Sequence, residues 1–144
     1  MMHFIVSGHG QFASGMVSAV TLIAGEANAF TAIDFPEGES ANALHERLQA
    51  ALMAAGDAPV IIFTDILGGM PFRTSAQLAA GRAHTEVVCG SNVQLLVEAV
   101  LERDEEDSPA SLLERILPGA REGLNVLTAI KPRTPVTPDA GDGI

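Results

Sequence analysis

The chain has no tryptophan and no tyrosine, so that six phenylalanines supply its large aromatic rings. A core with so few rings must be built mainly from Ala, Val, Ile, Leu and Met, which suits helices packed closely on a sheet. The same shortage leaves few rings on which the bases of single-stranded nucleic acid could stack. The aromatic content therefore argues against a single-strand-binding protein.

Cysteine is almost absent as well. Cys89 is the only one in the chain, so an internal disulfide is impossible and no cysteine cluster can hold structural zinc. We expect Cys89 to be a small core residue rather than a nucleophile. The N-terminal sequence lacks the basic segment of a signal peptide, and no stretch reaches the ~20 apolar residues of a membrane-spanning helix. These absences predict a soluble, cytoplasmic protein.

Basic residues are scarce. Eight Lys and Arg stand against 18 Asp and Glu, which gives a net charge of −10. That sign opposes binding to a phosphate backbone or to an anionic membrane surface. A protein partner with a basic face would instead be steered toward this surface. We therefore expect protein partners and no nucleic acid.

The residues that are present suffice for one domain. The chain has 144 residues, is 47% hydrophobic and has a mean hydropathy of +0.27, values typical of a single domain with a sizeable core. From Lys131 onward the sequence holds three prolines and ends in Asp139-Ala140-Gly141-Asp142-Gly143-Ile144. We predict a domain over residues 1–130 and a flexible tail over residues 131–144.

Short apolar runs alternate with longer segments of helical period, and Gly or Pro marks most of the joins. The pattern predicts strands at residues 3–7, 29–34, 59–64 and 85–89 and helices at residues 12–24, 40–55, 71–80 and 92–103. Four β/α units with right-handed crossovers imply an open, mostly parallel four-stranded sheet of order 2-1-3-4, with helices on both faces. The fold class is therefore α/β.

The C-terminal part of the chain departs from this alternation. Residues 112–122 have a helical pattern, but Pro118 and Gly119 are expected to kink or interrupt it. The apolar segment Leu124–Ile130 follows and is predicted to be a last strand.

A histidine between two glycines, Gly8-His9-Gly10, follows the first predicted strand. In an open parallel sheet, ligands and chemistry lie outside the carboxyl ends of the strands. Asp65 ends the third strand, beside the first, so its carboxylate can reach His9, fix the ring tautomer and leave the other nitrogen as nucleophile or base. The alternatives are a turn histidine that only faces solvent and an aspartate that only caps the loop after it.

The loop Gly68-Gly69-Met70-Pro71 follows Asp65 directly. Its glycines allow a close approach of the backbone to a ligand, and the helix that begins there points its positive end toward the same edge. We expect backbone amides of this loop and of Gly10 to bind an anion such as phosphate. We expect no metal, because no carboxylate cluster suited to magnesium lies near it.

The remaining histidines are His3, His45 and His84. None has a Cys, His or carboxylate partner at metal-ligand spacing, so we expect them to be structural or exposed.

Another interpretation comes from Gly8-His9-Gly10-Gln11-Phe12-Ala13, which satisfies the G-x-G-x-x-G/A pattern, with Asp34 near the position of a ribose-binding acid. A dinucleotide fold needs two mononucleotide-binding halves, however, and this chain has one four-unit sheet. A phospho-aspartate receiver domain needs an acidic pair after the first strand and a lysine near a later one, whereas Lys131 is the only lysine. A small nucleotide- or flavin-binding regulatory module remains the alternative.

Over roughly residues 2–130, the sequence resembles the EIIA components of the mannose-type sugar phosphotransferase system (PTS). The resemblance is carried by Ser7-Gly8-His9-Gly10, Phe12-Ala13-Ser14-Gly15-Met16, Ile33-Asp34-Phe35, Thr64-Asp65 with Gly68-Gly69 and Pro71-Phe72, and Asn92 with Leu95-Leu96-Val97-Glu98. The stretches around His9, Pro71-Phe72-Arg73 and Thr134-Pro135-Val136 look closest to the N-acetylgalactosamine or galactosamine branch.

The resemblance implies that His9 accepts a phosphoryl group from the phosphocarrier HPr and passes it to a IIB component, with Asp65 orienting the ring. Through IIB, the chain would serve the IIC and IID membrane components in the uptake of a hexose or amino sugar. The resemblance requires no cofactor. It also implies a homodimer in which Leu124–Ile130 is a strand swapped antiparallel onto the partner's sheet, although an ordinary edge strand is the alternative.

The chain departs from the family pattern at Met70, where members commonly have Ser or Thr. A side-chain hydroxyl that could bind phosphate is thereby lost, while the backbone amide remains, so a slower or differently tuned transfer is an open expectation. Phe72 and Arg73 are candidate contacts to the phosphate or to a partner, and the alternative for Arg73 is a solvated helix residue.

Overall fold

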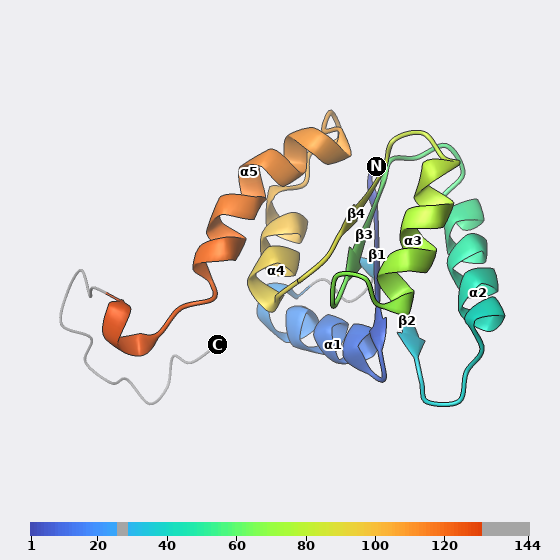
Figure 1. The fold of residues 1–144 in the computed structure, drawn as a ribbon. Helices are drawn as coiled ribbons and strands as arrows, with labels where there is room; N and C mark the ends of the chain where they lie inside the picture. The colour runs from blue at the N-terminus through green and yellow to red at the C-terminus, as the bar shows by residue number, and fades with distance from the viewer. Residues whose placement is uncertain (26–28, 131–144) are drawn as a thin grey trace.

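The structure is a computed structural model that describes residues 1–25 and 29–130. The predicted flexible tail at residues 131–144 lies outside the described residues. Four parallel strands form one sheet in the order β2-β1-β3-β4, and helices lie on both sides of it (Figure 1). The predicted α/β class and strand order are confirmed.

Strands and helices alternate along the chain up to the fourth helix. The strands are β1 (His3–His9), β2 (Phe30–Phe35), β3 (Val60–Thr64) and β4 (Thr85–Val88). The helices are α1 (Phe12–Ala24), α2 (Ala41–Ala54), α3 (Met70–Ala80), α4 (Val93–Glu102) and α5 (Pro109–Glu122), followed by a 3-10 turn, η1 (Leu127–Ala129).

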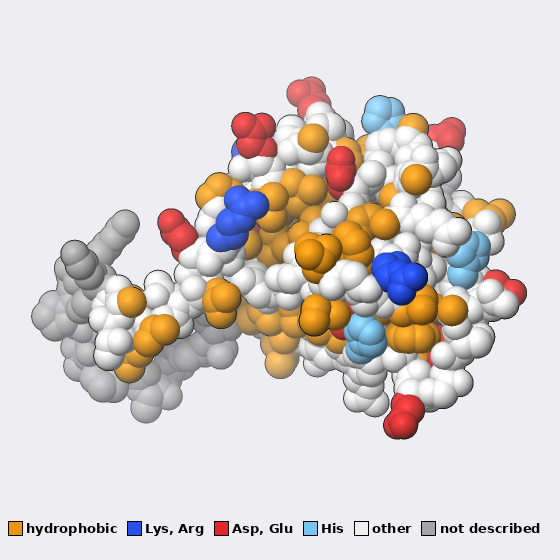
Figure 2. All heavy atoms as spheres, viewed as in Figure 1, with side chains coloured by type: hydrophobic (Ala, Val, Ile, Leu, Met, Phe, Trp, Pro, Cys, Tyr) orange, Lys and Arg blue, Asp and Glu red, His pale blue; other side chains and the backbone are white. Residues whose placement is uncertain are grey.

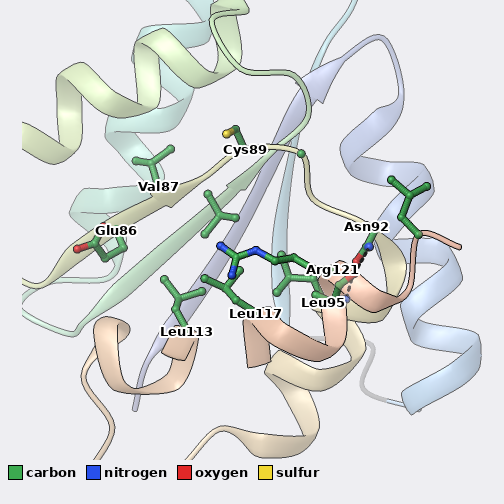
Figure 3. A pocket seen from close by; sticks show the side chains of 12 residues that line it. Glu86, Val87, Cys89, Asn92, Leu95, Leu113, Leu117 and Arg121 are labelled. Carbon is green, nitrogen blue, oxygen red and sulfur yellow. Dashed lines mark hydrogen bonds between the residues drawn. The ribbon is translucent and has the colours of Figure 1, made fainter. Parts of the chain in front are cut away.

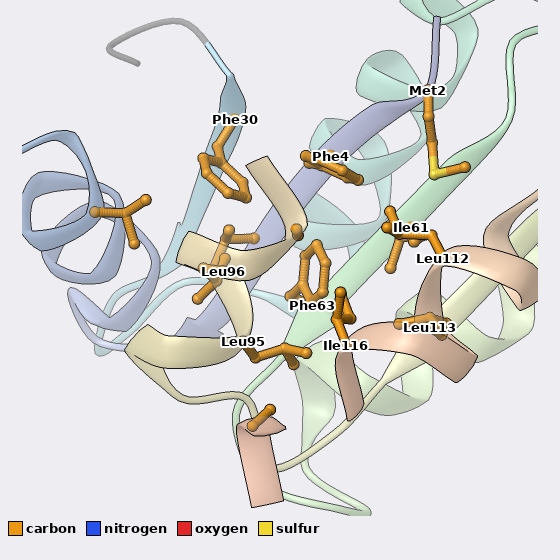
Figure 4. Packing of buried hydrophobic residues seen from close by; sticks show 14 of the residues in the cluster. Met2, Phe4, Phe30, Ile61, Phe63, Leu95, Leu96, Leu112, Leu113 and Ile116 are labelled. Carbon is orange, nitrogen blue, oxygen red and sulfur yellow. The ribbon is translucent and has the colours of Figure 1, made fainter. Parts of the chain in front are cut away.

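Each face of the sheet has its own hydrophobic cluster, because successive side chains of a strand point to opposite faces. Phe4 of β1 joins the cluster beneath α1, α4 and α5, whereas Ile5 joins the cluster beneath α2 and α3. In the first cluster, the ring of Phe4 lies 5.5 Å from that of Phe30 and 5.6 Å from that of Phe63 (Figure 4). Phenylalanine therefore fills the centre of one face, and aliphatic side chains fill most of the rest.

The predicted interruption at Pro118 is wrong. Helix α5 runs without a break through this proline, although proline has no N–H to donate one turn back and its ring crowds the carbonyl there. Pro118 is exposed, and Leu112, Ile116 and Ala120 on the opposite face are buried against the sheet. Burial of that face holds the helix together across the missing hydrogen bond.

The predicted strand at Leu124–Ile130 is also wrong for the single chain. This segment contains the turn η1, and every residue in it is exposed, including Leu124 at 88% and Leu127 at 83%. It leads away from the sheet (Figure 1) and pairs with no strand of the described residues. An extended segment without a paired neighbour has no partner for its backbone groups.

No helix within residues 1–25 and 29–130 is long and apolar enough to cross a bilayer.

Candidate functional site

His9 is the last residue of β1 and lies at the carboxyl edge of the sheet. It is four residues after Ile5, so its side chain points to the same face, the one that α2 and α3 cover. Gly10 follows with a φ of +57°, a value that favours glycine, and turns the chain toward α1. The strand direction and this turn place the imidazole at the beginning of α3.

Asp65 meets His9 from the neighbouring strand. Ser7 of β1 pairs in register with Thr64 of β3, so Asp65 follows at the same edge. Its Oδ2 lies 2.7 Å from His9 Nδ1 and also accepts a hydrogen bond of 2.8 Å from the His9 amide. The ionised carboxylate only accepts, so Nδ1 carries the hydrogen and the lone pair of the neutral ring lies on Nε2.

The protonation of Asp65 supports this arrangement. Burial alone would raise the pKa of the Asp65 carboxyl, but the hydrogen bonds from the backbone and ring of His9 outweigh it and lower the pKa below its usual value. Its side chain is 15% exposed, against 49% for His9. The site therefore pairs a shielded carboxylate with an accessible imidazole.

Gly69 is shaped to the ring of His9. A Cβ at this position would lie 2.6 Å from His9 Cε1 and 3.4 Å from Nε2. The φ of Gly69 is −70°, which any residue can adopt, so the position requires glycine for space rather than for conformation. Gly68 has a φ of +82° and does require conformational freedom. The predicted glycine loop thus lies directly beneath the imidazole.

Gly69 is also the N-cap of α3 and offers no side chain to the first turn. The amides of Met70 and Phe72 have no hydrogen-bond acceptor among the residues that the structure describes. Met70 packs its side chain against the cluster beneath α2 and α3, so only its backbone faces the site. An anion on Nε2 would meet free amides and the positive end of the helix dipole.

The surroundings of the site are apolar, with little charge. Ile66 and Leu67 are 62% and 69% exposed, Phe72 is half-buried, and Arg73 is exposed. Arg73 makes no ion pair within residues 1–25 and 29–130. In Figure 2, hydrophobic side chains, a histidine and a basic side chain gather on the surface near the beginning of α3.

Phe35 belongs to the site but was not singled out from the sequence. It pairs in register with His9, so both side chains lie on the same face, and the ring centroids are 6.0 Å apart in an edge-on arrangement. Its carbonyl also accepts a 2.8 Å hydrogen bond from Gly10 N. The sequence could have indicated Phe35 as a site residue. His9 and Phe35 are the last residues of two neighbouring parallel strands, and strand alternation places their side chains on the same face.

Asp34 has a different role from the one that the dinucleotide pattern suggested. Its carboxylate accepts hydrogen bonds from Ser14 N at 2.9 Å and Ser14 Oγ at 2.6 Å, so it caps the first turn of α1. The ring of Phe12 lies over Gly8, where an added Cβ would come within 2.3 Å of it. The place that a pyrophosphate would take in a dinucleotide site is thus filled by the chain itself.

The other candidate residues lie apart from His9. His3 begins β1, His45 is on α2, and His84 lies in the turn before β4 with a φ of +52°. Cys89 is partly buried just after β4. Within the described ranges, no group of three or more His, Cys, Asp or Glu side chains could hold a metal ion.

A groove of about 530 Å³ lies away from His9, between β4 and α5. Val87, Leu113, Leu117 and Arg121 line it (Figure 3), and Leu124 lines it as well. Strand β4 pairs only with β3 among the described residues, so its outer edge faces this groove. Apolar side chains and an unpaired strand edge therefore lie side by side.

Comparison with known proteins decides the family. The family model EIIA-man, described as PTS system fructose IIA component, matches residues 3–117. The chain belongs to the mannose-type EIIA family of the sugar phosphotransferase system. The match agrees with the family that the sequence resembles.

Two relatives of this chain, an EIIAB protein and an EIIA protein, differ in length, so the chain aligns with different shares of them. It is 30% identical over 126 residues to the mannose-specific EIIAB component of Escherichia coli K12, covering 87% of this chain and 39% of that protein. It thus spans about two fifths of that EIIAB protein. It is 27% identical to the sorbose-specific EIIA component of Lacticaseibacillus casei, covering 84% of this chain and 98% of that one.

The EIIA fold is shared with solved structures. The crystal structure of phosphotransferase system component EIIA from Streptococcus agalactiae matches 90% of this chain and 100% of its own, with 30% identity and a TM-score of 0.83. A mannose/sorbose-specific IIA subunit from Enterococcus faecalis is 20% identical, with a TM-score of 0.81 over 92% of this chain and 98% of its own, and supports the fold alone.

Proposed function

We propose that this EIIA component carries a phosphoryl group on His9, accepting it from HPr and passing it to a IIB component in the cytoplasm. The observation that carries the proposal is the 2.7 Å contact between His9 Nδ1 and Asp65 Oδ2, which leaves Nε2 free beside the N-cap of α3. Asp65 orients the ring, and Gly68, Gly69 and the Met70 amide form the loop beneath it. Gly10 contributes the turn after His9, because its own amide is already paired with the Phe35 carbonyl.

The proposed transfer needs no proton movement at His9. The Nε2 lone pair attacks the phosphorus of the donor phosphohistidine, and the donor P–N bond breaks with its electron pair returning to the donor ring. Nδ1 keeps its hydrogen, and the Asp65 carboxylate stabilises the positive charge that develops on the His9 ring. Transfer to IIB reverses these changes, with His9 as the leaving group.

The amides at the beginning of α3 would bind the phosphoryl oxygens while the group is on His9. The apolar side chains Ile66 and Leu67 and the charge of Arg73 would contact the partner protein. We propose that the transported substrate is a sugar of the classes named for the relatives. The galactosamine-type branch remains a prediction.

The test is incubation of the chain with phosphoenolpyruvate, enzyme I and HPr. We expect an acid-labile, base-stable phosphoryl adduct that is lost in His9→Ala and kept in His45→Ala, a matched control on α2. An adduct that persists in His9→Ala would contradict the assignment to His9. A purified protein that carries an absorbing nucleotide or flavin and takes no phosphoryl group would favour the alternative module.

We also propose a homodimer in which the Leu124–Ile130 segment of one copy lies in the groove beside β4 of the other. The segment is apolar and exposed, and the groove offers apolar side chains and an unpaired strand edge, features that favour strand addition. Truncation after Gly123 should weaken the dimer in sedimentation, whereas truncation after Ile130 should leave it intact. Equal sedimentation of both truncated forms would exclude this arrangement.

A further inference from the structure

The position of Asp65 is fixed through its backbone more than through its side chain. Both of its side-chain hydrogen bonds use Oδ2 and go to His9. Its Oδ1 is buried and has no hydrogen-bond partner in residues 1–25 and 29–130. No side chain of another described residue hydrogen-bonds the carboxylate. Besides His9, only the backbone of Ile66, the next residue along the chain, contributes to lowering its pKa. The placement of the carboxylate therefore depends on what anchors the backbone at residues 65 and 66.

That anchor is the loop between β4 and α4. Gly90 N donates a 2.5 Å hydrogen bond to the Asp65 carbonyl, and Ser91 N donates a 3.1 Å bond to the carbonyl of Thr64. Gly90 has a φ of +68°, so the loop makes this contact through a turn that favours glycine. The end of β3 thus moves with residues 90–91.

Asn92 fastens this loop at its other end. Its Oδ1 accepts a 2.9 Å hydrogen bond from Leu95 N and caps α4, while its Nδ2 donates a 2.7 Å bond to the carbonyl of Ala120 in the last turn of α5. Capping alone is a role that Ser, Thr or Asp fills equally well. An amide side chain is needed only because this residue must accept from one helix and donate to another.

We propose that Asn92 is a positioning residue for phosphoryl transfer, holding the loop that carries Asp65 in register with His9 by tying it to α5. This inference rests on the proposed carrier function of His9. Asn92 acts through Gly90, Ser91 and Asp65, and it has no recorded contact with the imidazole.

The chain offers a matched control for the role of Asn92. Gln94, in the same turn of α4, donates a 2.8 Å hydrogen bond from Nε2 to the Gly119 carbonyl of α5. This bond also joins α4 to α5, but Gln94 lies within the helix, and its side chain makes no hydrogen bond to residues 90–91 or to Asp65. A purely structural role of the α4–α5 contact would make the two residues equivalent.

The experiment compares Asn92→Ser, Asn92→Asp and Gln94→Ala with the full-length protein. Each is phosphorylated through HPr at saturating and limiting donor, and the ¹⁵N shifts of the His9 ring report the tautomer. Asn92→Asp keeps an oxygen that accepts from Leu95 N and loses the N–H that donates to the Ala120 carbonyl. It therefore tests the hydrogen bond to α5 while the cap of α4 is retained. It also carries the test if Asn92→Ser fails to fold.

Both Asn92 variants should lower kcat about 10-fold, as expected when a reacting group is displaced, with little change in KM. Their ¹⁵N shifts should show a mixture of tautomers, while Gln94→Ala should match the wild type in both respects. Equal behaviour of Asn92→Asp and Gln94→Ala would overturn the inference. If the wild type takes no phosphoryl group, the proposed function fails, and the ring shifts alone still decide the role of Asn92.

Discussion

Two helices, α1 and α3, begin at the same edge of the sheet, but their N-terminal turns meet different groups. At α1, the carboxylate of Asp34 takes the amide and hydroxyl of Ser14, and the ring of Phe12 lies over Gly8. At α3, Gly69 caps without a side chain and lies against the ring of His9. One helix end is capped by a side chain of the protein, and the other has no side-chain cap.

The difference between α1 and α3 shows why two similar glycine-containing turns do not have the same role. Both turns are rich in glycine and both helix dipoles point to the same edge, so the motifs alone are equivalent. The partner carboxylates distinguish them, because Asp34 occupies amides whereas Asp65 orients a nucleophile. Under the proposed function, an arriving phosphoryl group would therefore meet free amides at the beginning of α3, whereas the Ser14 amide near the beginning of α1 is already paired.

The largest expected effect comes from removing the charge that orients His9. Asp65→Asn should slow phosphorylation on the order of 10²-fold, because the amide can stabilise either ring tautomer and cannot balance the charge on the ring. Rapid-quench labelling through HPr measures the rate, and the ¹⁵N spectrum of His9 reports the tautomer. Asp34→Asn is the matched control at α1, and an equal slowing in both variants would remove the distinction between the two helix ends.

A smaller loss of activity is expected from Gly69→Ala. Its Cβ would lie 2.6 Å from His9 Cε1, so the ring must shift and transfer should slow about 10-fold, with little change in Tm because the φ of −70° suits alanine. The counterpart Gly8→Ala meets the ring of Phe12 and should lose about 1–3 kcal/mol of stability through overpacking. Equal rates for Gly69→Ala and the wild type would show that the ring tolerates the added methyl group.

Opening the capped helix end should affect stability rather than transfer. Asp34→Ala removes the cap of α1 and should lower the free energy of unfolding by about 1 kcal/mol, a fall in Tm of about 3 °C. The phosphorylation rate should stay within about twofold of the wild type, since such a surface change leaves His9 untouched. Calorimetry and labelling measure the two quantities. A large loss of transfer with unchanged Tm would assign Asp34 to the reaction.

The smallest effect is the contribution of Asp65 to acid stability. Its pKa is lowered in the folded state, so its stabilising contribution is present above the pKa of the unfolded chain, about 3.9, and is lost as the pH falls through the folded value. Asp65→Asn should therefore flatten the decline of Tm below about pH 4. The measurement is Tm by thermal melting as a function of pH in the wild type and in Asp65→Asn. If Tm falls equally steeply with decreasing pH in both proteins, the hydrogen bonds from His9 do not lower this pKa.

The contact between His9 and Asp65 could be predicted because each residue ends one of two adjacent parallel strands, and strand ends of this kind share an edge. The role of Asp34 could not, because its distance along the chain does not show that its carboxylate lies on the α1 face of the sheet. Pro118 and Leu124–Ile130 show the same limit. Local preference suggested a break in the first case and a strand in the second. Burial of Ile116 and Ala120 preserved the helix, and the apolar segment pairs with no strand of the described residues.

About half of the side chain of His9 is open to solvent, and under the proposed carrier function this exposure constrains the lifetime of the phosphorylated form. A phosphoryl group held there is reachable by a partner and equally by water. Its survival must then come from the slow hydrolysis of the P–N bond and not from enclosure. The energy carried from phosphoenolpyruvate is thus conserved only while encounters with the acceptor outpace hydrolysis, which ties the efficiency of uptake to the cellular concentration of that acceptor.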